Sequence, residues 1–495
     1  MTKLFSLTAS AMVLRATALS AVMLTGCSTL DLKPQKTVVA ADVPAAPISQ
    51  TGALQWSEAA PEDLPRTDWI AGFNDNQLTA LVDQALSQNT DIRVSEARYR
   101  AALARLGITQ ADLLPSVTAG GGVGRTESGN DLIGGSSSIS ARVDASWEYD
   151  LWGRIRDGVD AAELDVAASD ADYAGARLAI AARVTQTWFD LIEARLLTEL
   201  SEREVETQER ALRLTTRRFE GGVTGSSDVR LARSSLANAQ ALQSSRRQRL
   251  SALSRSLEVL LREYPDESLT AAADLPPLPL LSGAGTPAFV LRHRPDLLAA
   301  ERRMRAAGLN VDVARKALLP SLTLSGNITD NASALNNIFD IDSLVASLTA
   351  GLTAPIFQGG RIKANIEQQD QILRQQLEGY TGAVLTAYLE VENALDAEDR
   401  LEEREVALRT SLEEAVEAER RLELRYTEGL ASILQLLDSQ SRRLSAESQL
   451  ISARKERLSN RVRLHVALGG GDITNNGNLS PQLAENEVNF ASLQP

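Results

Sequence analysis

Two spacings of apolar residues occur along this chain, and they predict two kinds of element. Over residues 138–149, apolar and polar side chains alternate at every position, which is typical of a β-strand. This run is long enough for a tilted strand that crosses a membrane, and Trp147 and Tyr149 lie at its end. Residues 116–125 form a weaker, glycine-rich partner. Residues 116–149 therefore predict a β-hairpin.

A second pair of alternating segments follows much later in the chain. Residues 321–329 and 344–356 again place apolar side chains on one face and polar ones on the other, which predicts a hairpin over 321–356. A soluble antiparallel sheet covered on one face would show the same alternation. The pattern by itself leaves a membrane sheet and a covered soluble sheet as alternatives.

The longest segments have helical composition instead. Residues 176–220, 226–264 and 430–468 contain neither Gly nor Pro, and residues 362–427 contain only Gly379 and Gly382. A helix of about 60 residues is about 90 Å long. Helices of that length joined by a short turn pack as an antiparallel coiled-coil hairpin, so we expect long helix pairs and no compact globular core.

The chain is internally duplicated. Residues 91–102 align with 296–307, 113–116 with 318–321, 153–155 with 360–362, and the turn at Phe219 and Gly222 with Tyr426 and Gly429, always at an offset of 205 to 207. We therefore predict a first repeat over 66–270 whose helix pair turns near 219–226. A second repeat over 288–468 turns near 426–432. A linker of residues 271–287 joins the two, and a flexible tail covers 469–495.

The N-terminus predicts export and a lipid anchor. Lys3 and an apolar stretch precede Leu24-Thr25-Gly26-Cys27, which matches a bacterial lipobox. We expect residues 1–26 to be a signal peptide, Cys27 to carry the lipid (palmitate), and residues 27–65 to form a proline-containing tether. Ser28 after the cysteine indicates the outer membrane. An ordinary signal peptide with a coincidental cysteine is the alternative.

Composition argues against several other functions. A formal net charge of −14 with no basic cluster excludes nucleic acid as an expected partner. The sequence has two histidines and one cysteine. His293 and His465 lie in different predicted elements without the spacing of a triad or a metal site. We expect no enzyme activity, no catalytic residues, no cofactor and no metal.

Four predicted membrane strands cannot form a barrel alone. Hydrocarbon cannot satisfy the free edge of a sheet, and closed membrane barrels have at least about eight strands. Several chains must therefore share one barrel. Two chains would give eight strands with a filled interior, and three would give twelve strands and a pore.

Several stretches, in their order along the duplicated chain, resemble the TolC-like outer-membrane factors, in particular the lipoprotein (NodT-type) branch. They are residues 69–73 with Asp75, residues 89–91, residues 294–296 with Glu301, residues 355–361 and the two glycine turns. The resemblance covers about residues 65 to 470. It implies a mainly α-helical protein with membrane β-strands, forming a trimeric twelve-stranded outer-membrane β-barrel continued by a long antiparallel α-helical barrel in the periplasm.

The resemblance also implies a function and partners. Such proteins are passive exit ducts of tripartite efflux pumps. A periplasmic adaptor, the membrane fusion protein, grips and opens the helical tips, and an inner-membrane resistance-nodulation-division pump supplies the energy. A homotrimer in outer-membrane lipid is therefore expected, with Gly222, Val223, Gly429 and Leu430 at the tips that contact the adaptor. A glycine required by the turn itself is the alternative explanation for the two glycines.

The gate residues are likewise implied by the resemblance. Asp438 matches the inner position of the constriction, while Gln435 replaces a carboxylate of the family. Tyr426 and Asp228 match two members of the network that keeps the pore closed, and Ala431 stands where an arginine is expected. Solvated helix-surface carboxylates are the alternative for Asp228 and Asp438.

Two other functions remain open from the sequence. A type I protein-secretion duct shares the fold, although lipidation and the Arg294-Pro295-Asp296 stretch favour the efflux branch. A non-transporting helical lipoprotein with a structural role would not need four amphipathic strands. The transported substrate, the particular pump and the particular adaptor do not follow from the sequence.

Overall fold

The computed structural model describes residues 56–57, 68–126, 136–281, 283–332 and 344–470. The chain divides into two units, Met1–Ser49 and Gln50–Pro495. The predicted signal peptide, the lipidation site Cys27, all but residues 56–57 of the predicted tether and all but residues 469–470 of the predicted tail lie outside the described residues.

Apart from one short 3₁₀ helix, the elements occur twice in the same order. The first set is the 3₁₀ helix η4 (Ala71–Phe73), α2 (Asn76–Gln88), α3 (Thr90–Ala111), β1 (Ser116–Thr126), β2 (Ser136–Tyr149), α4 (Arg154–Glu220) and α5 (Ser226–Leu260). The second set is α6 (Pro287–His293), α7 (Pro295–Lys316), β3 (Ser321–Ala332), β4 (Val345–Thr353), α8 (Arg361–Thr427) and α9 (Ile433–Ala467). Both α3 and α7 have 22 residues, α4 and α8 have 67, and α5 and α9 have 35. For these three pairs of helices the repeat in the sequence is thus also a repeat of length, whereas α2 and α6, with 13 and 7 residues, differ.

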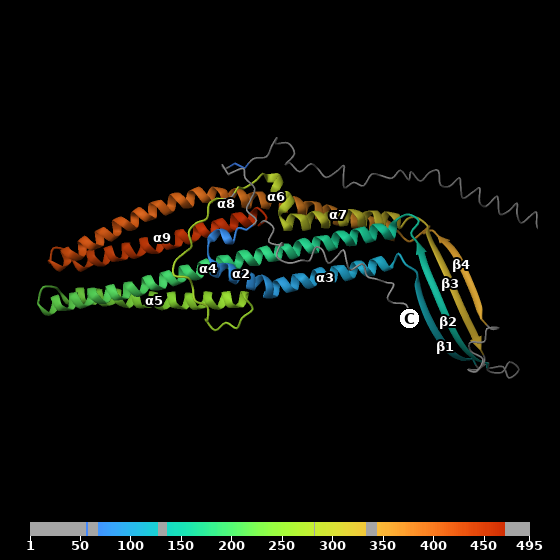
Figure 1. Ribbon diagram of the computed structural model, residues 1–495, viewed down its shortest axis with the longest axis horizontal. Helices are drawn as coiled ribbons and strands as arrows, with labels where there is room; N and C mark the ends of the chain where they lie inside the picture. The colour runs from blue at the N-terminus through green and yellow to red at the C-terminus, as the bar shows by residue number, and fades with distance from the viewer. Residues whose placement is uncertain (1–55, 58–67, 127–135, 282, 333–343, 471–495) are drawn as a thin grey trace, which may run out of the picture. The chain divides into compact units, whose positions relative to one another are not determined.

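The strands form one antiparallel sheet in the order β1-β2-β3-β4 (Figure 1). The register aligns the apolar positions of all four strands. Val143 lies between Ala119 and Ile328, and Ile328 in turn lies opposite Ala346. Val143 and Ile328 are exposed, so in the described residues this apolar face of the sheet is uncovered.

Two edges of the sheet are open within the chain. Among the described strands, β1 pairs only with β2 and β4 pairs only with β3. β4 ends at Thr353, although the alternation continues to residue 356. Pro355 explains the earlier end, because proline has no amide hydrogen for a ladder and restricts the residue before it.

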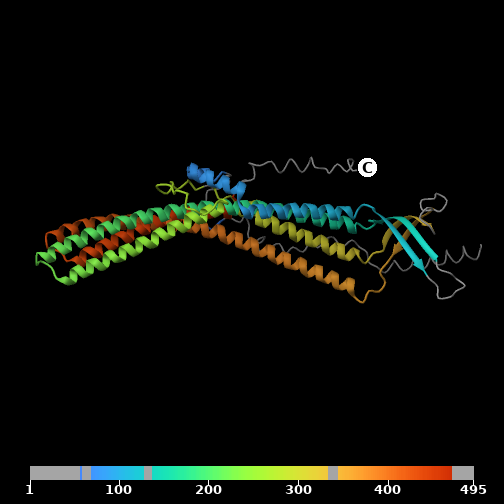
Figure 2. The same cartoon turned by 90° about the horizontal axis from the view of Figure 1, so that it is seen from below.

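Helix α4 is the element that joins the others. Four residues separate it from the end of β2, and it continues without interruption to the turn before α5 (Figures 1 and 2). It packs against α5 and α9 towards that turn and against α3 and α7 towards the sheet, while α8 packs against α7 and α9. Helix α4 therefore contacts elements of both repeats.

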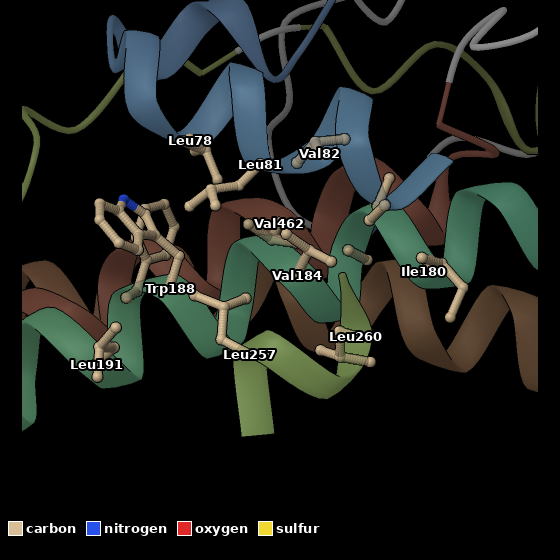
Figure 3. Close-up of a cluster of buried hydrophobic side chains, with 14 of the residues drawn as sticks. Leu78, Leu81, Val82, Ile180, Val184, Trp188, Leu191, Leu257, Leu260 and Val462 are labelled. Atoms are coloured by element: carbon tan, nitrogen blue, oxygen red, sulfur yellow. The ribbon is translucent and has the colours of Figure 1, made fainter. Parts of the chain in front are cut away.

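The main apolar core lies where α2 and the end of α5 meet α4 and α9. Leu78 and Val82 of α2 point at Val184 and Trp188 of α4, and Val462 of α9 lies beside them (Figure 3). All five side chains are buried. Burying a side chain of this size contributes about 1.5–3 kcal/mol, so this cluster holds the two repeats together.

A buried arginine adds a polar connection between helices of the second repeat. Arg294 precedes α7, and its guanidinium donates to Asp296, to Glu390 of α8 at 2.6 Å and to the carbonyl of Ala467 of α9 at 3.2 Å. The pKa of Asp296 is lowered by its hydrogen bond and ion pair with Arg294, which outweigh the opposing effect of burial. The Arg-Pro-Asp stretch thus fixes the start of α7 against the middle of α8 and the end of α9.

None of the helices in the described ranges is both long and apolar enough to cross a bilayer. The same ranges contain no group of three or more His, Cys, Asp or Glu side chains placed to hold a metal ion.

Asp75 gives a direct test of the core. Its carboxylate accepts from the amides of Gln77 and Leu78, capping α2, and from the buried indole of Trp188 at 2.8 Å. We expect Asp75→Ala to destabilise the protein by about 2–4 kcal/mol, because a cap is lost and a buried N–H is left without a partner. Thermal unfolding in detergent measures this. Asp83→Ala, at an exposed acid of α2, is the control and should have little effect.

Candidate functional site at the two helical turns

The two glycine turns have the same backbone geometry. Gly222 and Gly429 adopt left-handed conformations, with φ of 72° and 82°. In each turn the residue after the glycine donates its amide to the carbonyl five residues earlier, at 2.8 Å. This is the Schellman ending of a helix, which favours glycine because a Cβ is strained at positive φ. The turn itself therefore accounts for both glycines.

The residues after the glycines project outward. A Schellman ending usually places an apolar residue here against another near the helix end. In this chain the facing positions are Arg218 and Arg425, whose carbonyls accept the turn hydrogen bonds. Val223 is 65% exposed and Leu430 is 64% exposed. Each turn thus presents an aliphatic side chain that the chain itself leaves largely uncovered.

Tyr426 fastens the second turn to α4. It is 1% exposed and packs against Ile433 and other apolar residues at the start of α9. Its hydroxyl lies 2.9 Å from the hydroxyl of Thr215, which already donates to the carbonyl of Ala211, so Tyr426 is the donor. The guanidinium of Arg218 lies over the tyrosine ring, 4.7 Å from its centre, and donates to the Tyr426 carbonyl. The second repeat is therefore bound to the first at this point.

Asp228 does not take part in this contact within the chain. It lies half-buried in the first turn of α5, and its amide donates to the carbonyl of Gly225. In the part of the chain that the structure describes, its carboxylate makes no hydrogen bond or ion pair, and the Tyr426 hydroxyl bonds to Thr215 instead. The sequence analysis missed Thr215 and Arg218. Their spacing of three places them on one face of a helix, but nothing in the sequence indicates which helix they face.

The remaining predicted gate residues lie on the outer face of the first turns of α9. Gln435 and Ser432 form a capping box, in which each side chain bonds the backbone of the other residue. Asp438 is 59% exposed, and its carboxylate accepts from Arg442 at 2.9 Å. Leu434, also exposed, lies one turn before Asp438. Gln435 thus has a local structural role that the resemblance does not indicate, and Asp438 is paired.

The two histidines occupy structural positions. His293 of α6 stacks on Phe289, and His465 of α9 is buried against Trp69.

The duplicated fold and its paired turns define this chain as an outer membrane efflux protein. The outer membrane efflux protein family matches residues 81–261 and 287–470. The chain belongs to this family.

Two relatives match most of the chain. Outer membrane protein OprJ of Pseudomonas aeruginosa is 31% identical over 440 residues, which are 86% of this chain and 91% of that protein. The probable efflux pump outer membrane protein TtgC of Pseudomonas putida is 30% identical over 474 residues, 94% of this chain and 97% of that protein. These relatives are named as outer-membrane and efflux proteins.

Solved structures show the same fold. The outer-membrane channel OprN superposes with a TM-score of 0.78 at 29% identity, covering 85% of this chain and 97% of that chain. The CmeC outer membrane channel of Campylobacter jejuni superposes with a TM-score of 0.80 over 88% of this chain and 94% of its own; at 23% identity it supports the fold alone.

The contact between Thr215 and Tyr426 can be tested by a double-mutant cycle. Thr215→Val removes the acceptor and Tyr426→Phe removes the donor. We expect each change to weaken the second turn by about 1–2 kcal/mol and to speed amide exchange there about tenfold, and the double variant to cost less than the sum. Hydrogen–deuterium exchange is the measurement. Thr216→Val, at the neighbouring half-buried threonine, should leave exchange unchanged, and additive effects of the two changes would refute the contact.

Proposed function

We propose that this protein is the exit channel of a tripartite efflux pump, conducting small molecules passively across the outer membrane. The observation that carries the proposal is the open-edged sheet with an uncovered apolar face, attached to two long helix hairpins. The names of the relatives support it, since they specify pyoverdine export, antibiotic efflux and toluene efflux. Cargoes this different favour a passive duct that leaves selection to the pump. The same names favour efflux over type I secretion or a structural role.

The channel would be a homotrimer. The backbone groups on the free edges of β1 and β4 need partners in hydrocarbon, and the first strand of one copy can pair with the last strand of the next. Two copies would give a barrel filled by side chains, whereas three give twelve strands and a pore. The helices of the three copies would then continue the pore as a periplasmic tunnel. A monomeric mass in detergent would remove the basis of this assembly.

The anchor and the partners follow from the same assembly. Cys27 would hold the N-terminus to outer-membrane lipid, since each buried CH₂ of an acyl chain contributes about 0.8 kcal/mol. A periplasmic adaptor would bind at Gly222, Val223, Gly429 and Leu430. An inner-membrane resistance-nodulation-division pump would provide the energy. The exposed aliphatic side chain at each turn supports the adaptor contact, because it offers apolar area that can be buried without unfolding the turn.

The constriction would lie on the exposed face of α9. Three copies of Asp438 around the axis would form an acidic ring, with Leu434 and Gln435 one turn nearer the tip. Tyr426, with Thr215 and Arg218, would hold each second turn in its packed position, and Asp228 would be available to a neighbouring copy. Pairing of Asp438 with the exposed Arg442 moderates the charge of the ring.

The adaptor contact is tested by placing a charge at each tip. We expect Val223→Asp and Leu430→Asp, separately, to reduce drug efflux in cells about tenfold or more, because a carboxylate in an apolar contact must be desolvated. Assembly and single-channel conductance should be unchanged. Val406→Asp, at an exposed position of α8 farther from the turn, is the control. Normal efflux by both tip variants would contradict the contact.

The acidic ring is tested by conductance. Asp438→Ala should raise single-channel conductance in a planar bilayer and weaken block by divalent cations, because like charges around an axis bind such cations. Glu413→Ala, at an exposed acid of α8, should change neither property. Conductance and block that both stay at the wild-type level would remove Asp438 from the gate.

A further inference from the structure

A second polar cluster joins the two helix hairpins between the glycine turns and the apolar core. Arg443 of α9 is only 14% exposed, and three carboxylates surround it. It pairs with Glu447 of its own helix at 2.8 Å, with Glu204 of α4 at 3.1 Å and, through Nε, with Glu419 of α8. One guanidinium therefore ties three helices from both repeats together.

The surface around Arg443 is polar rather than apolar. Glu204 also accepts from Gln208 at 2.6 Å, and Gln208 donates to Gln440 of α9 at 3.2 Å. Arg203 pairs with Glu447 at 2.7 Å. When such groups separate, water hydrates them again, so a polar contact of this kind adds little net stability. The free energy needed to open it is lower than that for an apolar contact. The contact between α4 and α9 is thus suited to reversible separation.

The cluster contains more negative than positive charges. Glu204, Glu419 and Glu447 face two guanidinium groups, those of Arg203 and Arg443, which leaves one negative charge in excess. The Glu204 side chain is 4% exposed and that of Glu419 is 12% exposed. An uncompensated charge at such a site is destabilised by loss of hydration.

We propose that the Arg443 cluster is a proton-sensitive latch, which takes up one proton while α9 of the α8–α9 hairpin packs against α4 and so favours this packed state in acid. The latch rests on the proposed channel function, because separation of these helices would widen the mouth of the tunnel. It is distinct from the Tyr426 contact and from Asp438. Glu419 is the residue that holds the proton.

The direction of the effect follows from the electrostatics of Glu419. Burial raises its pKa above the ordinary 4.5, as do the nearby carboxylates Glu204 and Glu423, against the opposing pull of Arg443. A carboxyl with a raised pKa in the packed state binds its proton more tightly there than when hydrated. Packing is therefore favoured below the raised pKa, and this contribution is lost as the pH rises through it. One proton per chain changes the ratio of packed to separated states by at most about tenfold per pH unit.

Distance measurements test the latch without relying on transport. Spin labels at Glu209→Cys on α4 and Ser441→Cys on α9, in full-length Cys27→Ser protein, report the separation of the two helices by pulsed electron resonance. In this labelled protein without further substitutions, we expect the fraction of molecules with a short distance between the two labels to increase when the pH falls from about 7.5 to about 5. Glu419→Gln, which mimics the protonated acid, should show the larger population at both pH values.

The controls separate the latch from a general effect of charge. Glu413→Gln removes the same charge from an exposed site of α8 and should respond to pH like the parent. Glu447→Gln removes one negative charge from a less buried member of the cluster. This variant replaces Glu419→Gln in the test if Glu419→Gln does not assemble. It should also abolish the response. A response that persists in these cluster variants, or longer distances in acid, would overturn the proposal.

Conductance distinguishes this proposal from the channel function. In an Asp438→Asn background, which removes the carboxylate at the constriction, acid should still lower the open probability, and adding Glu419→Gln should abolish that effect. A normal channel whose pH response ignores Glu419 refutes the latch alone. A pH-dependent distance in a protein that conducts no ions refutes the channel function and leaves the latch.

Discussion

The open edges of the sheet are the constraint on which the proposed assembly depends. β1 and β4 have unpaired backbone groups on their outer sides, and the apolar rows of all four strands lie on one face. In hydrocarbon, unpaired amides and carbonyls cost several kcal/mol each, which is why we propose that the sheet continues into other copies of the chain. In the proposed trimer, the symmetry of the strands would extend to the turns, because α4 and α8 follow β2 and β4 after short connections.

The character of the contact between α4 and α9 changes along its length. Around Trp188 the contact is apolar and lies in the main core. Around Arg443 it consists of ion pairs and amide hydrogen bonds, and only a small apolar cluster around Tyr426 closes the end. The part around Trp188, which holds the helices together, therefore has an apolar core. The part around Arg443, which is proposed to move, has polar groups that water can hydrate.

Each glycine turn contains a glycine that the backbone requires, followed by an exposed aliphatic residue. Gly222 and Gly429 are explained by their left-handed backbone, whereas Val223 and Leu430 are largely exposed within the described part of the chain. Of the residues proposed to contact the adaptor, the two aliphatic ones are thus those that the turns do not require. Gln435 shows the converse, since its capping box gives it a structural reason to be where it is.

The sequence alone determined the kinds of element, their order and their duplication, because strand alternation and uninterrupted helical segments are local properties. It also located both turns, since glycine at positive φ is a local requirement. Tertiary structure alone decided that Tyr426 bonds to Thr215 and stacks with Arg218, that Asp228 stays apart, and that Glu204, Glu419 and Arg443 meet. These contacts join residues more than 200 positions apart or on separate helices. They depend on how α4, α8 and α9 are rotated against one another, and a helical repeat in the sequence does not specify that rotation.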